Sequence, residues 1–150
     1  MTELINNVKF NTKLLIKKKE YICKTKTWYS IKEDENVRYI KCELSDDTVL
    51  VVMPDDNFIC LGKVIEDLEY KKVSKDKIIY QNKSYFKTGE GNQYILNIEF
   101  GNREDVEGSC FFEDYEFEDQ VISLGILTDK NNERADVLAK IIGLEDISIK

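Results

Sequence analysis

The sequence predicts a mainly β protein that forms a single domain over residues 1–150, as a β-barrel or β-sandwich. Short runs rich in Val, Ile, Tyr, Phe and Thr recur about every eight to twelve positions and are separated by polar turn residues. One proline and seven glycines leave no linker between domains. Hydrophobic residues make up 42% and charged residues 34%, which is typical of a globular chain of this length.

The expected strands are joined by short polar segments of the kind that close β-hairpins, such as Asp46-Asp47, Gln81-Asn82-Lys83 and Gly89-Glu90-Gly91. Five strands are expected in the first half: Leu14–Lys18, Tyr21–Ile31, Val37–Leu44, Val49–Met53 and Phe58–Leu61. Five more are expected in the second half: Ile78–Tyr80, Ser84–Lys87, Gln93–Phe100, Val106–Phe112 and Val121–Leu127.

One short C-terminal helix is expected within Glu133–Gly143, because its apolar residues recur near helical spacing after a polar run. Gly143 would end this helix, and Ile147-Ser148-Ile149 would return as an edge strand. Val and Ile suit a strand as well as a helix, so the strand alternative stays open for this segment.

Two segments, 13–64 and 77–127, resemble each other. The run Phe58–Val64 matches Val121–Leu127 at an offset of 63, and Leu15-Ile16 with Glu20-Tyr21 parallels Ile79-Tyr80 with Ser84-Tyr85 at an offset of 64. An internal repeat would give a pseudo-two-fold barrel or two similar packed sheets. Chance likeness between short apolar strands is the alternative.

Composition also indicates the compartment. The first ten residues include Glu3 and no apolar run long enough for a signal peptide, so a cytoplasmic protein without membrane insertion is expected. Cys23, Cys42, Cys60 and Cys110 lie far apart in apolar surroundings, and we expect buried, reduced thiols that are slow to react. The net charge of −7 opposes direct binding to nucleic acid.

No catalytic residue, metal ligand set or cofactor motif is found. The chain contains no histidine, which excludes histidine-based triads and histidine-ligated metals. Glycine-rich phosphate and dinucleotide loops, close cysteine pairs and the calcium-loop pattern are also missing. The expectation is therefore a protein that is not an enzyme and carries no cofactor.

Acidic side chains concentrate in residues 99–119, where nine carboxylates are opposed only by Arg103. In a strand, Tyr115 and Phe117 would face one side while Asp114, Glu116 and Glu118 face the other. The predicted partner-binding residues on this acidic face are Glu113, Asp114, Glu116, Glu118 and Asp119. An ordinary solvated outer face is the simpler alternative.

The run from Asp76 to Leu127 resembles a bacterial family catalogued as domain of unknown function 4178. The likeness rests on Ile78-Ile79-Tyr80, Ser84-Tyr85-Phe86, Val106-Glu107-Gly108, Asp114-Tyr115-Glu116 and Ile122-Ser123-Leu124, with a looser match at Arg38–Leu44 followed by Asp47. The resemblance implies a β-rich fold of two similar halves in a bacterial, membrane-stress or phage-associated context. It brings no activity and no catalytic residues.

Three functions remain open from the sequence. The first is a non-catalytic module that presents the acidic face to a basic protein partner. The second is an acidic inhibitor, phage-encoded, that mimics nucleic acid. The third is a small hydrolase that uses paired carboxylates or a divalent ion in a barrel mouth, which would need a buried carboxylate pair in a concave pocket. The oligomeric state is not indicated.

Overall fold

The computed structural model describes residues 1–150 and is built almost entirely from β-strands. The first six strands are β1 (Lys13–Ile16), β2 (Lys19–Ile22), β3 (Lys26–Ile31), β4 (Asp34–Leu44), β5 (Thr48–Met53) and β6 (Phe58–Val64). The remaining strands are β7 (Lys71–Ser74), β8 (Lys77–Tyr80), β9 (Lys83–Phe100), β10 (Cys110–Phe117), β11 (Gln120–Leu127), β12 (Glu133–Arg134), β13 (Val137–Ile142) and β14 (Ile147–Ile149). The helical elements are α1 (Thr2–Asn7) and three short 3₁₀ turns, η1 (Pro54–Asp56), η2 (Arg103–Asp105) and η3 (Leu144–Asp146).

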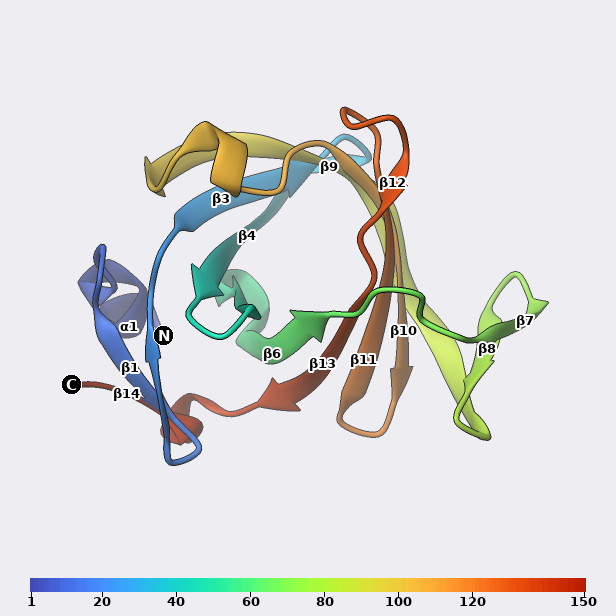
Figure 1. The fold of residues 1–150 in the computed structure, drawn as a ribbon, viewed down its shortest axis with the longest axis horizontal. Coiled ribbons are helices and arrows are strands. Elements are labelled where there is room, and N and C mark those ends of the chain that lie inside the picture. The colour runs from blue at the N-terminus through green and yellow to red at the C-terminus, as the bar shows by residue number, and fades with distance from the viewer.

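Eight of these strands close into an antiparallel barrel. They pair in the order β10-β11-β13-β6-β5-β4-β3-β9, and β9 pairs with β10 to complete the ring (Figure 1). Closure leaves no unpaired edge in the ring. The predicted mainly β, barrel-type fold is confirmed.

Several hairpins close through two residues that both have positive φ, the geometry of type I′ turns. Lys17 and Lys18 form one such turn, Gln81 and Asn82 another, and the predicted Asp46-Asp47 pair a third. This turn type matches the right-handed twist of the strands it joins, so short polar pairs between apolar runs specify the register locally.

The largest apolar core lies against the outer wall of the barrel. Outward side chains of β4 and β5, such as Ile40, Leu50 and Val52, pack beneath α1 and the small sheet β14-β1-β2. Figure 1 shows α1, β1 and β14 outside the ring, on the side where both chain ends lie. A cluster of 14 buried residues fills this layer, so the small sheet serves as a cover over one side of the barrel.

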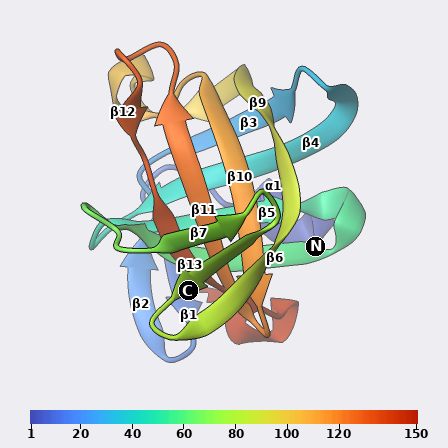
Figure 2. The ribbon, with the colours of Figure 1, turned by 90° about the vertical axis from the view of Figure 1, so that its right-hand side faces the viewer.

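A second cover lies over the other side of the ring. The hairpin of β7 and β8 extends from β9 and crosses the outside of β10 and β11 (Figure 2). Ile78 and Tyr85 pack there against Tyr115, Ile122 and Leu124, all buried. These two outer clusters bury the outward residues of most barrel strands.

The predicted C-terminal helix in Glu133–Gly143 is wrong. Residues 133–134 form β12, and 137–142 form β13, which inserts between β11 and β6. Val and Ile fit both helical spacing and a strand, and here closure of the barrel decides for the strand. The expected edge strand at 147–149 is present as β14, and the only α-helix, α1, was not predicted.

The turn expected at Gly89-Glu90-Gly91 is also wrong, because these residues lie inside the long strand β9. Gly89, Glu90 and Gly91 pair with β10 next to a bulge at Thr88, and β9 exchanges β10 for β3 only further along, at Gln93. Glycine inside a strand is typical of such a bulge, and a bulge bends the strand that carries it. Val106–Ser109, expected as strand, is part of the loop after η2.

The internal repeat stays a prediction. Each half of the barrel is a four-stranded meander, β3-β4-β5-β6 and β9-β10-β11-β13. The matched runs fall on β6, fourth in its meander, and β11, third in the other. All four cysteines are unpaired and buried, which confirms their expected burial.

Candidate functional site in the barrel lumen

The inside of the barrel contains a cavity of about 460 Å³, which we call the lumen cavity. All eight barrel strands contribute to its wall. Valines supply much of its apolar surface, among them Val37, Val49, Val51, Val121 and Val137. Pockets for small ligands have volumes of roughly 300–1,000 Å³ and mainly apolar walls, so the lumen cavity has the size and surface of a ligand site.

The cavity exists because small residues line one side of the barrel. Tyr29 and Tyr39 stack with ring centroids 5.6 Å apart on β3 and β4. On β6, β11 and β13 the residues that line the cavity include the small Cys60, Ser123 and Ala139. At Gly89, an added Cβ would have no atom within 4 Å. These small residues and Gly89 therefore leave open space in a wall that otherwise carries larger apolar side chains.

A buried hydrogen-bonded network lies along this wall, built around Glu107. Lys41 Nζ donates to Glu107 Oε1 over 2.7 Å, and Gln93 Nε2 donates to the same oxygen over 2.8 Å. The Tyr39 hydroxyl donates to Gln93 Oε1 at 2.6 Å, and the Tyr29 hydroxyl donates to the Glu107 carbonyl at 2.5 Å. These bonds hold the loop after η2 against the barrel interior.

The Lys41–Glu107 ion pair keeps both groups charged. Burial acts to lower the pKa of Lys41, but the neighbouring Glu107 carboxylate raises it above the ordinary value. Burial likewise acts to raise the pKa of Glu107, and Lys41 with the Gln93 amide lowers it. The Lys41 ammonium also lies 5.4 Å from the Tyr29 ring centre and 5.9 Å from that of Tyr39.

Other carboxyl groups in the cavity have no such partner. Glu43 is partly buried, and its pKa is raised to about 7 by loss of hydration and by the nearby Glu107 and Asp105 carboxylates. Burial also raises the pKa of Asp114, against the lowering effect of Ser123 and Lys41. The raised pKa values show that the lumen disfavours unpaired negative charge.

One buried hydroxyl in the wall is unsatisfied. Thr27 is 1% exposed and lines the cavity, yet its Oγ1 has no hydrogen-bond partner. The Tyr29 phenol lies near this hydroxyl but makes its own hydrogen bond to the Glu107 carbonyl. An unpaired buried hydroxyl costs roughly 1–3 kcal/mol, so Thr27 offers a free hydrogen-bonding group to a bound molecule.

The five predicted partner-binding residues do not share one face. Asp114 and Glu116 line the lumen cavity, whereas Glu113 makes an ion pair with Lys87 at 2.7 Å. Glu118 is exposed at the β10–β11 turn, and Asp119 pairs with Lys140 at 3.5 Å. The alternation along β10 was predicted correctly, but its acidic side faces the inside of the barrel. The five residues therefore do not form one outer acidic face, and docking of a basic partner stays a prediction.

Sequence reasoning missed Lys41, Glu43, Gln93 and Glu107 as candidate site residues. A signal was present in β4, where Lys41 and Glu43 alternate with the apolar Ile40, Cys42 and Leu44. Charged residues at alternate positions usually indicate a solvated face. Here the opposite face is covered by the outer core, so the charged face lies inside the ring.

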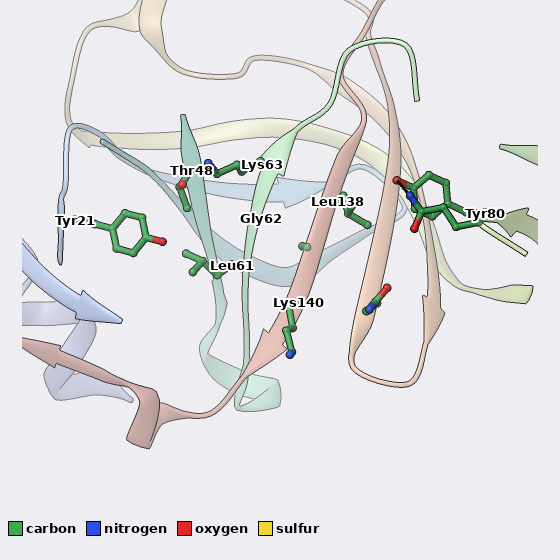
Figure 3. Close-up of a pocket in the computed structure, with 11 residues that line it drawn as sticks. Tyr21, Thr48, Leu61, Gly62, Lys63, Tyr80, Leu138 and Lys140 are labelled. Carbon is green, nitrogen blue, oxygen red and sulfur yellow. Dashed lines mark hydrogen bonds between the residues drawn. The ribbon is translucent and has the colours of Figure 1, made fainter. Parts of the chain in front are cut away.

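A second depression of about 390 Å³ lies outside the barrel, between the β1–β2 hairpin and the β8–β9 turn. Figure 3 shows Tyr21 and Tyr80 at its two sides and Leu61 and Leu138 between them. Its lysines, Lys63 and Lys140, pair weakly with nearby surface carboxylates. Its buried polar side chain, Thr48, already donates a hydrogen bond to the Asp46 carbonyl, so the depression offers no unsatisfied buried group like Thr27 of the lumen.

Comparison with protein-family models, curated proteins and solved structures finds no match. No helix in the structure has the length and apolar character needed to cross a membrane. No group of three or more Asp, Glu or Cys side chains is arranged to hold a metal ion. The resemblance to the domain of unknown function 4178 stays a prediction.

Proposed function

We propose that the protein binds a small, mainly apolar molecule inside its barrel. The observation that carries this proposal is the lumen cavity of about 460 Å³ in a protein whose main apolar cores lie outside the ring. The outer clusters supply the packing that folding requires, so the inside need not be filled by side chains. An apolar cavity with a few fixed polar groups is the usual form of a small-molecule site.

The entry side is indicated by three of the four exposed residues of the cavity wall, the fourth being Val64 at the other end of β6. Asp56 in η1 and Thr88 and Glu90 at the bend of β9 line the cavity and are exposed to solvent. The Lys41–Glu107 network, in contrast, holds the loop after η2 in place against the barrel interior. A ligand entering past η1 and the β9 bend would reach this polar network last.

The test uses N-phenyl-1-naphthylamine, a neutral apolar dye whose fluorescence rises when it leaves water. We expect saturable binding of one dye per chain. Gly89→Leu should weaken it at least tenfold, because the new side chain enters open cavity space without meeting another atom at Cβ. Phe86→Leu, at an exposed position of the same strand that does not line the cavity, is the matched control and should bind normally. Absence of saturable dye binding by the wild type would overturn the proposal.

A second candidate function is hydrolysis by paired carboxyl groups, because Glu43 and Glu107 line the same concave cavity with opposite pKa shifts. A protonated carboxyl beside an ionised one is the arrangement of many acid–base pairs. A panel of p-nitrophenyl glycosides and esters tests it. Turnover lost in both Glu43→Gln and Glu107→Gln, with Glu118→Gln unaffected, would support catalysis. No turnover by the wild type leaves binding as the proposal.

A further inference from the structure

The charges inside the lumen cavity are strongly unbalanced. Among its wall residues, Lys41 is the only base, against six acids. These acids are Glu43, Asp56, Glu90, Glu107, Asp114 and Glu116. Glu107 is neutralised by Lys41 and Glu90 lies 3.1 Å from Lys87, but the other four carboxyl groups form no ion pair. The cavity wall therefore has an excess of carboxyl groups without cations.

Lys41 shows that groups in the cavity wall can stabilise a charged ammonium. Burial alone would favour the neutral amine, yet the Glu107 carboxylate at 2.7 Å keeps Lys41 protonated and raises its pKa. The faces of Tyr29 and Tyr39 lie within 6 Å of the same nitrogen. The wall thus replaces the hydration of one ammonium with a carboxylate and two aromatic rings.

Glu43 and Thr27 offer a place for a second cation. Thr27 pairs with Lys41 across β3 and β4, so Glu43, two residues further on β4, is its diagonal neighbour on the same face. The Glu43 carboxyl forms no ion pair, and the Thr27 hydroxyl has no partner. An ammonium donates to carboxylate and hydroxyl oxygens alike, so it would satisfy both groups.

We propose that the ligand is an organic amine, with an apolar body in the lumen and one protonated nitrogen held by Glu43 and Thr27. This inference rests on the proposed function, since it names the class of molecule that the cavity takes. The apolar body would lie against the small residues of β6, β11 and β13, where the lumen is open. A carboxylate ligand would meet unpaired acids and be disfavoured.

Binding of an amine should depend on pH through Glu43. Its surroundings include Asp105 in η2, Glu107 in the loop after η2, Lys41 on its own strand and Lys130 from the β11–β12 turn. With a pKa of about 7, Glu43 is mostly protonated at pH 6 and mostly ionised at pH 8. The ammonium pairs with the ionised form, so its affinity should rise about tenfold between these values, with release of a proton at the lower pH.

The experiment displaces bound N-phenyl-1-naphthylamine with three compounds that share one body, namely 4-phenylbutylamine, 4-phenylbutanol and 4-phenylbutyrate. At pH 8 we expect the amine to bind at least tenfold more tightly than the alcohol, and the carboxylate to bind most weakly. Equal affinity of amine and alcohol would overturn the inference and leave the proposed function intact. Failure of the dye itself to bind would overturn both.

Substitutions locate the ammonium. Glu43→Gln should remove most of the amine's advantage and its pH dependence while leaving the affinity of the alcohol within about twofold. Thr27→Val, which keeps the side-chain shape, should weaken the amine several-fold. Glu118→Gln removes an exposed carboxylate outside the cavity and is the matched control. An amine preference that persists unchanged in Glu43→Gln would contradict the assigned position, with melting curves confirming that each variant is folded.

Discussion

The two sides of the barrel wall differ in how they are packed. Along β5, the outward residues Leu50 and Val52 are buried, whereas the inward Val49 and Val51 are only partly buried. All four are apolar and lie on one strand. The difference is that α1 and the small sheet cover the outside, while the inside faces a cavity.

This comparison indicates how the fold separates stability from binding. Apolar area removed from water stabilises folding by about 25 cal/mol per Å², and most of it here lies between the ring and its covers. The lumen instead contains an ion pair, unpaired carboxyl groups and an unsatisfied hydroxyl, which favour folding weakly or oppose it. Such costly groups are typical of functional sites.

The largest expected effect concerns the buried ion pair. Lys41→Met should lower the free energy of unfolding by about 3–5 kcal/mol, because it leaves the Glu107 carboxylate partly buried without a cation. Adding Glu107→Leu should recover most of this loss. Chemical denaturation measures both, and Lys140→Met, which breaks a surface pair, should cost at most about 1 kcal/mol. Equal effects at Lys41 and Lys140 would contradict a buried pair.

Two neighbouring valines test the comparison most directly. Val52→Ala should destabilise by about 2–3 kcal/mol, because Val52 is 3% exposed in the outer core. Val51→Ala removes the same atoms from the cavity wall and should cost only about 1 kcal/mol, since Val51 is partly buried and packs against the small inner cluster of Cys60, Val121 and Ala139. Urea unfolding compares the two. A larger loss at Val51 would mean that the lumen, not the outer wall, is the main core.

Much of this architecture could be predicted from the sequence, because strands and tight turns depend on local chemistry. The apolar run Thr48–Met53 and the polar pair Asp46-Asp47 indicate a strand and its turn without tertiary information. The C-terminal strand could not be separated from a helix in the same way. Val137, Leu138, Ile141 and Ile142 satisfy both periods, and only pairing with β6 and β11 decides between them.

The candidate site was harder to predict because alternation does not say which face is inside. In β10, Tyr115 and Asp114 were correctly expected on opposite sides. Acidic side chains normally face water, so the sequence predicts Asp114 on the outer, solvent-facing side of the strand. The hairpin of β7 and β8, which is distant in sequence, instead covers Tyr115 and leaves Asp114 in the lumen. The covering elements therefore determine the site.

Stability should also depend on pH through Glu43. Its folded pKa of about 7 lies above the ordinary 4.5, so the folded state holds a proton that the unfolded state releases. The contribution of Glu43 to the free energy of unfolding is therefore greatest below about pH 4.5, and it is lost as the pH rises from there through 7. The difference between 4.5 and about 7 corresponds to at most about 3.4 kcal/mol, and solvent screening at this partly exposed group reduces it, so Glu43→Gln should gain about 2 kcal/mol at pH 8 and little at pH 4.5. Thermal unfolding of both proteins across this range measures it, and a pH-independent difference would contradict the raised pKa.

The smallest effect is expected at the outer carboxylates Glu118 and Asp119, which lie at the exposed β10–β11 turn. Glu118→Gln with Asp119→Asn should change the free energy of unfolding by less than about 1 kcal/mol, because an exposed ion pair such as Asp119 with Lys140 contributes little. The same variant tests docking of a basic partner, since Asp114 and Glu116 face the lumen. Retention on immobilised poly-lysine at low salt should fall in the variant if this turn attracts basic surfaces, and salt should reduce retention of the wild type equally. Unchanged retention, with lumen binding also unchanged, would show that these carboxylates are ordinary solvated surface and that the acids that matter lie inside the barrel.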